Sequence, residues 1–358
     1  MAPLLLPALF LALPAALPQD RVLLADGGSE AGRVSSATLD EITLEDDGEA
    51  RSIPAAEVVD LRFGALPASL TRAEEMVRAL DYANAVNLLD AATAEPDPTG
   101  AIAGLRKAEA LLAWSAVDPS QAGEAVAAFQ GWLAEHADHF FVPRARIGLA
   151  RAMARSGQVD QAAQELEQVA SLAFEKSLPK TVEYRARLAR CRVYLEGGQA
   201  GIAVSRLQDL VPRIQGDRSS SDLPTGVRRA LGPLLTEGRI LLGDAIEADQ
   251  GISAAESYWQ GLLRSADLDG DVRAAATLGL AKAARAGGQL RRAQLLAARV
   301  VATMPAGREV SARALYLLGE LTAELGDDIA ASRPYFRRVA DLYPETVWAV
   351  RAREQAGE

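Results

Sequence analysis

Residues 278–305 read LGLAKAARAGGQLRRAQLLAARVVATMP, and this stretch decides the fold of most of the chain. On either side of Gly287 and Gly288, apolar residues recur at the spacing i, i+3, i+4 and i+7, which is the pattern of a helix with one buried face. A glycine pair between two such segments is typical of a short turn between antiparallel helices. The stretch therefore predicts a helical hairpin.

The same pattern extends over most of the sequence. Residues 315–344, LYLLGELTAELGDDIAASRPYFRRVADLYP, form a second good copy, and Ala, Leu, Arg and Glu dominate from Leu66 onward. Further glycines, such as Gly157 and Gly251, separate the helical segments from one another. The chain from Leu66 therefore predicts an array of helical hairpins.

Residue sizes repeat at fixed offsets along this array. An alanine stands early in the second helix of each predicted hairpin: Ala85, Ala125, Ala162, Ala203, Ala255, Ala293 and Ala331. The residues twelve positions earlier are all small: Ala73, Ala113, Ala150, Cys191, Gly243, Ala281 and Gly319. Those four positions later are large in all but one case: Leu89, Phe129, Leu166, Leu207, Trp259, Ala297 and Tyr335. Small side chains let two helices approach and a large one fills the gap beside them, so the offsets predict packed hairpins, with Cys191 as a buried spacer.

These offsets resemble those of the tetratricopeptide repeat (TPR), a helix–turn–helix unit of about 34 residues. The resemblance covers residues 66–344 and departs from the family in its longer spacings, in the missing aromatic residue early in the first helix, and in Pro334 within a second helix. It implies a mainly α fold, a right-handed α-solenoid of about seven hairpins. We expect hairpins one to four over residues 66–215, a polar loop at 216–226 that separates two sub-arrays, and hairpins five to seven with a C-terminal helix over 227–358.

A small all-β module is expected before the helices, over residues 20–64. About five short β-like runs alternate there with turn sequences at residues 26–29 (DGGS) and 46–48 (DDG). The segment from Asp20 to Phe63 holds eleven acidic residues against four arginines, so it carries most of the chain's net charge of −10. It resembles an SH3-like or Sm-like barrel. Two roles stay open: a docking or oligomerising module, or a cap on the helical array.

The N-terminus has the composition of an export signal. Residues 1–18, MAPLLLPALFLALPAALP, lack charged side chains and are too short and proline-rich for a spanning helix. We expect a signal peptide cleaved between about residues 15 and 19, and a periplasmic or secreted protein without an integral membrane span. The inter-repeat segment 136–143 (HADHFFVP) also resembles that of TPR proteins of the bacterial cell envelope.

The composition argues against most catalytic and cofactor-dependent functions. One cysteine and two histidines leave little for metal or nucleophilic chemistry, and no phosphate-binding, dinucleotide-binding or serine-hydrolase motif occurs. His136 and His139 stand at i and i+3 without a clear third ligand, and the run 267–271 (DLDGD) lacks the later positions of a calcium loop. We therefore expect no enzyme activity, no metal and no cofactor. The acidic N-terminal module also disfavours nucleic acid.

Candidate binding residues follow from the TPR resemblance, because the first helix of each hairpin lines a concave groove in that family. The corresponding positions are Lys107, Trp114, Arg144, Arg151, Arg185 and Arg192, then Glu237, Asp244, Lys282, Arg313 and Glu320. The first set forms a basic stripe, which predicts an acidic peptide or protein partner, or capture of the chain's own acidic module. The alternative is a solvated face of an arginine-rich protein.

The sequence therefore predicts a non-enzymatic scaffold of the cell envelope that binds a peptide or protein in its groove. Two alternatives stay open. In one, the β module of an envelope accessory factor binds polysaccharide, lipid or a membrane complex. In the other, the chain is an enzyme of unfamiliar chemistry.

Overall fold

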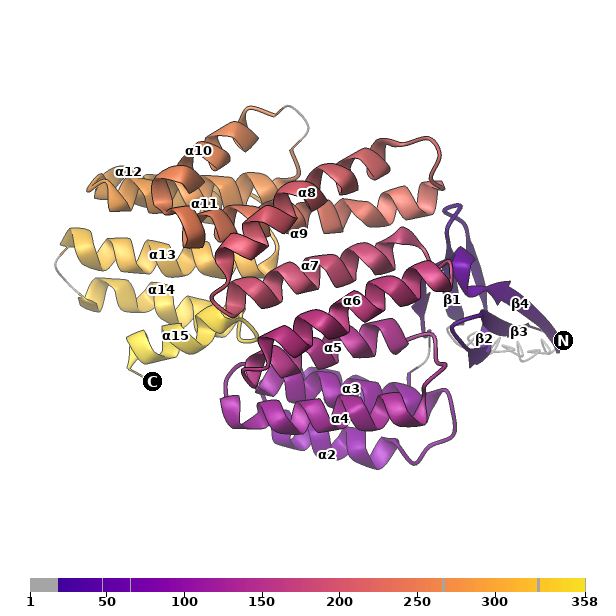
Figure 1. The fold of residues 1–358 in the computed structure, drawn as a ribbon. Helices are drawn as coiled ribbons and strands as arrows, with labels where there is room; N and C mark the ends of the chain where they lie inside the picture. The colour runs from indigo at the N-terminus through magenta and orange to yellow at the C-terminus, as the bar shows by residue number, and fades with distance from the viewer. Residues whose placement is uncertain (1–18, 47, 65, 266–267, 327–328, 358) are drawn as a thin grey trace, which may run out of the picture.

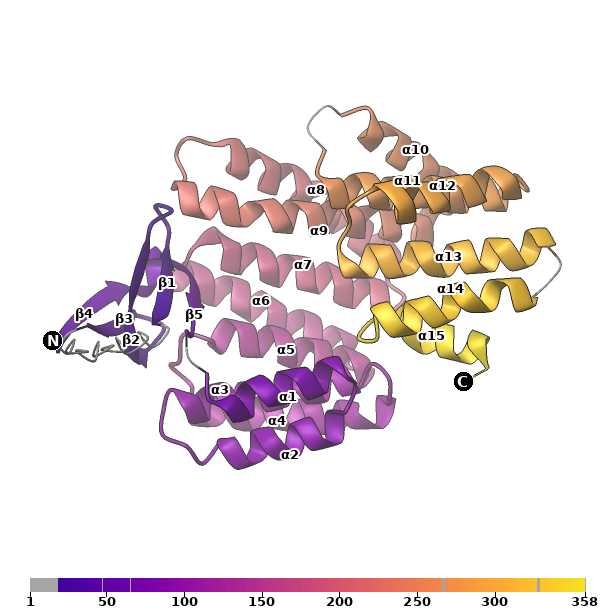
Figure 2. The same ribbon diagram turned by 180° about the vertical axis from the view of Figure 1, so that it is seen from behind.

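The computed structural model describes residues 19–46, 48–64, 66–265, 268–326 and 329–357. The predicted signal peptide lies outside these ranges. Figures 1 and 2 show an array of paired helices, with a small sheet beside the ends of the helices around α5, α7 and α9. No helix in the described ranges is long and apolar enough to cross a membrane.

The sheet confirms the predicted all-β module. Its strands are β1 (Asp20–Leu24), β2 (Ser29–Ala37), β3 (Glu41–Asp46), β4 (Glu49–Pro54) and β5 (Val58–Arg62), with the short 3-10 helix η1 (Ala55–Glu57) before β5. All pairings are antiparallel, in the order β4-β3-β2-β1-β5. Alternate residues such as Val22, Val34 and Ile42 are fully buried, as expected for strands with one face toward a core.

The helices confirm the α-solenoid. They are α1 (Ala68–Arg78), α2 (Tyr82–Ala92), α3 (Thr99–Trp114), α4 (Ala122–Glu135), α5 (Val142–Arg155), α6 (Val159–Glu175), α7 (Lys180–Glu196), α8 (Ala200–Ser219), α9 (Thr225–Gln250), α10 (Ile252–Leu263), α11 (Gly270–Ala286), α12 (Leu290–Thr303), α13 (Arg308–Gly326), α14 (Ile329–Leu342) and α15 (Val347–Ala356), with η2 (Pro119–Gln121) before α4. Within the described ranges, consecutive helices pack in pairs from α1/α2 to α13/α14, which gives seven hairpins followed by α15.

The predicted size pattern describes the packing in most hairpins. Ala85, Ala162, Ala203 and Ala255 have no exposed surface, and the large residue four positions later is buried in each case. Aromatic residues take the place of leucine where glycine faces them. A Cβ added at Gly243 or Gly279 would lie within 2.3 Å of the Trp259 ring. The close approach of these helices therefore depends on the absence of side chains at those two positions.

Two hairpins depart from the predicted offsets. In the last hairpin Ala331 is exposed, and Ser332 and Phe336 take the buried small and large positions instead of Ala331 and Tyr335. The offset from Gly319 is thirteen there rather than twelve. In the second hairpin Ala113 is only half-buried, and η2 stands in the connection between α3 and α4.

The prediction of a polar loop at residues 216–226 that separates two sub-arrays is wrong, both in the length of the loop and in the separation. Helix α8 continues to Ser219 and α9 begins at Thr225, so only residues 220–224 connect them. The hydroxyl of Tyr184 donates to Oδ2 of Asp217 at 2.6 Å and Lys180 Nζ donates to the same atom at 2.7 Å, which holds the polar end of α8 in helical form. Helices α8 and α9 pack along one shared core, so the connection joins two neighbours and separates no sub-arrays.

The β module is docked on the ends of the helices. Its apolar face shares a core with residues of α3, α4 and α5. The Leu39 N–H donates to the Asp138 carbonyl at 2.8 Å and the Phe140 N–H donates to the Ala37 carbonyl at 3.0 Å. On the other side, the Gly226 N–H at the start of α9 donates to the Ala25 carbonyl at 2.7 Å. These contacts fix the module against the helix ends, and both roles left open by the sequence stay predictions.

Candidate functional site

A continuous groove runs along the first helices of the hairpins. It consists of three adjoining hollows of about 660, 700 and 560 Å³, lined mainly by α5 and α7, by α9 and α13, and by α11 and α13. Arg192, Glu237 and Glu309 line both the first and the second hollow, and Arg313 lines both the second and the third. Figure 2 shows α5, α7 and α9 side by side, with α13 and α15 at the ends of these helices that lie away from the β module.

The hollow nearest the β module has an apolar floor. Phe140, Ile147, Val182 and Ala189 line it from α5, α7 and the segment before α5, and Val59 of β5 lines one end. Arginines of α5 and α7 surround this floor. An apolar floor with a few charged groups at its edge is the usual composition of a ligand or peptide site.

Most of the predicted basic stripe is neutralised by carboxylates of neighbouring helices. Arg144 Nε and Nη2 donate to both carboxylate oxygens of Glu109 at 2.6 and 2.8 Å, and Arg192 Nη2 donates to Glu237 at 2.9 Å. The remaining pairs are Arg313 with Asp244, Arg285 with Glu320, and Lys282 with Glu247. The stripe is therefore largely paired. Arg144 and Lys282 pair with acids of the preceding first helix, whereas Arg192 and Arg285 pair with acids of the following one.

Arg151 and Arg185 differ from the other cations of the stripe. Both side chains are exposed in the first hollow, and neither has a hydrogen bond or ion pair to any residue that the structure describes. The groove walls withdraw water from the Arg151 guanidinium and Arg192 lies nearby, and both effects lower the pKa of Arg151. The charged residues that line this hollow are four arginines and the acids Asp60, Glu237 and Glu309, so the lining has a net charge of +1.

Lys107 and Trp114 lie away from the groove. Lys107 forms an ion pair with Asp90 of α2. The Trp114 ring stacks on Tyr82, with 6.2 Å between ring centroids and an interplanar angle of 11°. Both side chains therefore join the first two hairpins to each other, and neither lines any of the three hollows.

Comparisons with known proteins bear on the fold. No protein-family model matches the chain, and no curated protein matches it. Solved structures do: a tetratricopeptide repeat protein from Parabacteroides merdae (TM-score 0.47, 13% identity, 81% of this chain and 98% of that one) and the apo form of the quorum sensor NprR from B. thuringiensis (0.43, 11%, 76% and 74%). A third is the TPR2AB domain of yeast Sti1 in complex with pHSP90 (0.27, 14%, 71% and 98%). The chain is an α-solenoid of helical hairpins. Each likeness concerns the fold alone.

Two groove elements of the TPR-like array escaped the sequence analysis. Glu309 of α13 faces the first hollow and accepts a hydrogen bond from Trp348 Nε1 at 2.7 Å. Residues Val58, Val59 and Asp60 of β5 close the other end of that hollow. Both lie in segments far in sequence from α5 and α7. Only the curvature of the solenoid and the docking of the module bring them together.

The other candidate residues have packing roles in the structure. Cys191 is buried among the residues of α7 and α8, and its burial raises the pKa of the thiol to about 11. The Asp269 side chain accepts from the Asp271 N–H at 2.8 Å and caps α11, whereas Asp267 lies outside the described residues. Within the described ranges, no three His, Cys, Asp or Glu residues are grouped as a metal site would require.

His139 links the β module to the array. It pairs with Thr38 in a β-bridge, its Nδ1 accepts the Phe141 N–H at 3.1 Å, and its ring packs edge-on against Trp132 at 5.5 Å. Burial, with a smaller effect from His136, lowers the pKa of His139 to about 4. The folded protein therefore keeps this imidazole neutral.

We expect His139 to make the protein sensitive to mild acid. Its folded pKa of about 4 lies below the ordinary value of 6.5, so the unfolded state binds a proton first as the pH falls. The free energy of unfolding should fall between pH 7 and pH 4, with about 1–2 kcal/mol lost through this residue at pH 5. Urea unfolding at pH 7.5 and pH 5 measures it. His139→Gln should remove this part of the pH dependence, whereas His136→Gln should keep most of it. If the free energy of unfolding changed equally between pH 7.5 and pH 5 in the parent and in both variants, His139 would not be the residue responsible.

Proposed function

We propose that this protein is a non-enzymatic scaffold that binds an acidic, partly apolar peptide segment of a partner protein in its groove. One observation carries the proposal: the guanidinium groups of Arg151 and Arg185, which have no partners among the described residues, lie beside the apolar floor of the first hollow. The chain as a whole has a net charge of −10, so this positive site contrasts with its surroundings.

The two parts of the hollow supply different components of binding. Burial of an aliphatic or aromatic side chain on Ile147 and Val182 supplies affinity through the hydrophobic effect. A carboxylate of the same segment accepts charge-assisted hydrogen bonds from the arginines, which sets its position and favours acidic sequences. The ion pairs of Arg144 and Arg192 hold the neighbouring side chains in place before the ligand arrives.

Export is part of the same proposal. Residues 1–18 have the composition of a signal peptide, so we place the scaffold in the cell envelope or outside the cell. The alternative, in which an SH3-like β module makes the contact with polysaccharide, lipid or a membrane complex, leaves the groove without a role. Variants in the groove therefore separate the two proposals.

A peptide-display selection on the purified protein tests the groove. The selected peptides should carry an acidic residue close to an aromatic or aliphatic one. Arg151→Glu combined with Arg185→Glu should weaken the best peptide about 100-fold in a fluorescence polarisation titration, because two charge-assisted hydrogen-bonding groups are lost and repulsion is added.

A second double variant serves as a control, because it changes the net charge of the protein by the same amount. Arg291→Glu with Arg299→Glu changes two exposed arginines of α12, neither of which lines the groove. This control should bind the peptide within about twofold of the parent. Equal weakening in both double variants, or peptides without acidic residues, would count against a specific groove.

A further inference from the structure

A separate cavity of about 310 Å³ opens between α6 and α8, above α7. It uses the opposite face of α7 from the groove. Arg185 and Arg192 line the groove, whereas Arg187 and Arg190 line this cavity; each lies two positions away, about 200° around the helix. The cavity shares no lining residue with the groove.

The cavity is positively charged in an acidic protein. Its lining contains the four arginines Arg187, Arg190, Arg206 and Arg213, with the two carboxylates Glu167 and Asp209. The lining therefore has a net charge of +2. Such a cluster of like charges is unfavourable unless counter-charges lie close to it.

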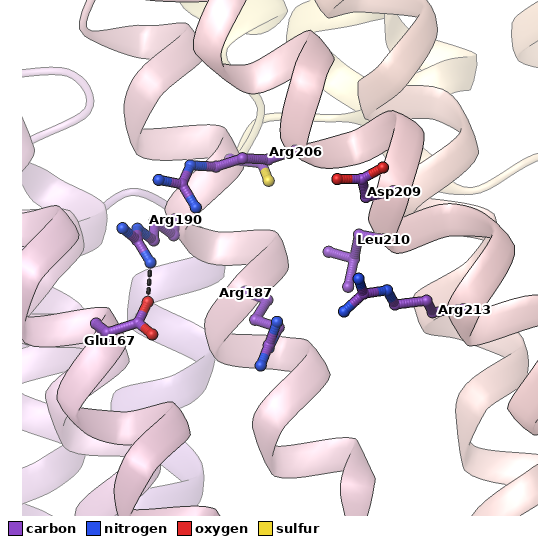
Figure 3. A pocket seen from close by; sticks show the side chains of 8 residues that line it. Glu167, Arg187, Arg190, Arg206, Asp209, Leu210 and Arg213 are labelled. Carbon is purple, nitrogen blue, oxygen red and sulfur yellow. Dashed lines mark hydrogen bonds and ion pairs between the residues drawn. The ribbon is translucent and has the colours of Figure 1, made fainter.

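Arg190 and Arg206 are both engaged by the protein itself. Arg190 forms an ion pair with Glu167, as the dashed line in Figure 3 marks. The Arg206 guanidinium lies over the Tyr194 ring, 5.4 Å from its centroid. These contacts hold both side chains at the same side of the opening.

The other two arginines keep free donors. Arg187 Nη2 forms an ion pair with Glu183 at 2.8 Å, but its Nε is buried and has no hydrogen-bond acceptor among the described residues. Arg213 has no polar partner within the described part of the chain. Figure 3 shows Arg187 and Arg213 reaching the same opening from α7 and α8.

We propose that this cavity binds a phosphate group, either free or as a small phosphate monoester. A tetrahedral oxyanion offers several acceptors to guanidinium groups and neutralises the excess charge. The volume is close to the lower limit of small-molecule sites, so it has room for an organic group beside Leu210. This site is independent of the peptide groove.

Isothermal titration calorimetry of the full protein tests the proposal with two probes, inorganic phosphate and glycerol 3-phosphate. Both should bind, and Arg187→Gln with Arg213→Gln should weaken the binding at least tenfold. Arg291→Gln with Arg299→Gln, a pair of exposed arginines of α12 that line neither the groove nor the cavity, should leave it unchanged. Arg187→Lys with Arg213→Lys keeps the two positive charges but removes the planar guanidinium groups, which can donate two parallel hydrogen bonds to an oxyanion. This variant should bind phosphate with an affinity between those of the parent and of the Arg187→Gln, Arg213→Gln variant.

The outcomes separate the two sources of the phosphate group. Binding of the ester at least tenfold more tightly than inorganic phosphate assigns the site to an esterified ligand, and equal binding of the two assigns it to the free ion. Absence of binding by both probes overturns the proposal. Equal weakening of phosphate binding by both pairs of Arg→Gln substitutions also overturns it, because it would show that phosphate responds only to the overall charge of the protein. Circular dichroism confirms that each variant is folded.

Discussion

Replacing Trp259 with alanine is expected to lower the free energy of unfolding by about 3–5 kcal/mol. The side chain is 2% exposed and lies against Gly243 of α9 and Gly279 of α11, so its loss leaves a cavity shared by two hairpins. Because each hairpin of a solenoid is stabilised by its neighbours, the last hairpins should lose stability together with the fifth. Urea unfolding followed by circular dichroism measures the change, and a loss below about 1 kcal/mol would contradict the packing described for Trp259.

A paired substitution tests the size pattern more directly. A Cβ at Gly243 would lie 1.9 Å from the Trp259 ring, so Gly243→Ala alone should cost about 1–3 kcal/mol despite the better helix propensity of alanine. Hairpins one, three and four pair a small residue with leucine, as in Ala150 and Leu166. Gly243→Ala with Trp259→Leu should therefore be more stable than Gly243→Ala alone. The indole N–H of Trp259 has no acceptor among the described residues, so leucine loses no hydrogen bond there. Additive costs in the double-mutant cycle would contradict the compensation.

Gly226→Ala is expected to detach the β module from α9. A Cβ at this position would lie 2.3 Å from the Leu24 carbonyl oxygen, 2.7 Å from that of Ala25 and 2.8 Å from the Gly27 nitrogen. All three are backbone atoms, so no side-chain rotation can relieve the overlap. The variant should lose the hydrogen bonds that the Gly226 and Val227 N–H groups donate to Ala25, and about 2–4 kcal/mol of stability.

Hydrogen exchange locates this effect, since the amides of Gly226 and Val227 should exchange much faster in the variant. Gly216→Ala is the matched control: its Cβ would meet nothing within 4 Å, and it lies within α8. That substitution should raise stability by about 0.5–1 kcal/mol. Unchanged protection of residues 226 and 227 in Gly226→Ala would show that the contact contributes little to docking.

The fold was predictable because its main signals are local. The helical spacing of the apolar residues and the turn glycines can both be recognised within one hairpin. The recurring small residues, including Cys191, indicate where one helix packs against the next. The errors have equally local causes. Ala331 is as small as Ser332, so composition could not show which of them faces α13. Residues 216–219 have the polar composition of a loop. They are helical in the structure, where Asp217 accepts hydrogen bonds from Tyr184 and Lys180, both distant in sequence.

The site was less predictable because its geometry is not local. The TPR resemblance placed Arg144, Arg151, Arg185 and Arg192 correctly on one groove, but it gave no information on the carboxylates opposite them. Whether Arg192 is paired depends on the register between α7 and α9, which no spacing in the sequence reveals. The apolar floor around Ile147 carries no special motif. Glu309 enters the hollow only because the solenoid curves.

The docked β module has a mechanical consequence. A solenoid whose units touch only their neighbours behaves as a spring, and its curvature changes by small rotations added over many units. Here one rigid sheet is attached at residues 138–140, between the second and third hairpins, and again at Gly226 at the start of the fifth. These two attachments bridge the intervening hairpins. We expect this double attachment to stiffen the intervening hairpins and so to restrain the width of the first hollow, whereas the hairpins beyond α10 have no such attachment among the described residues.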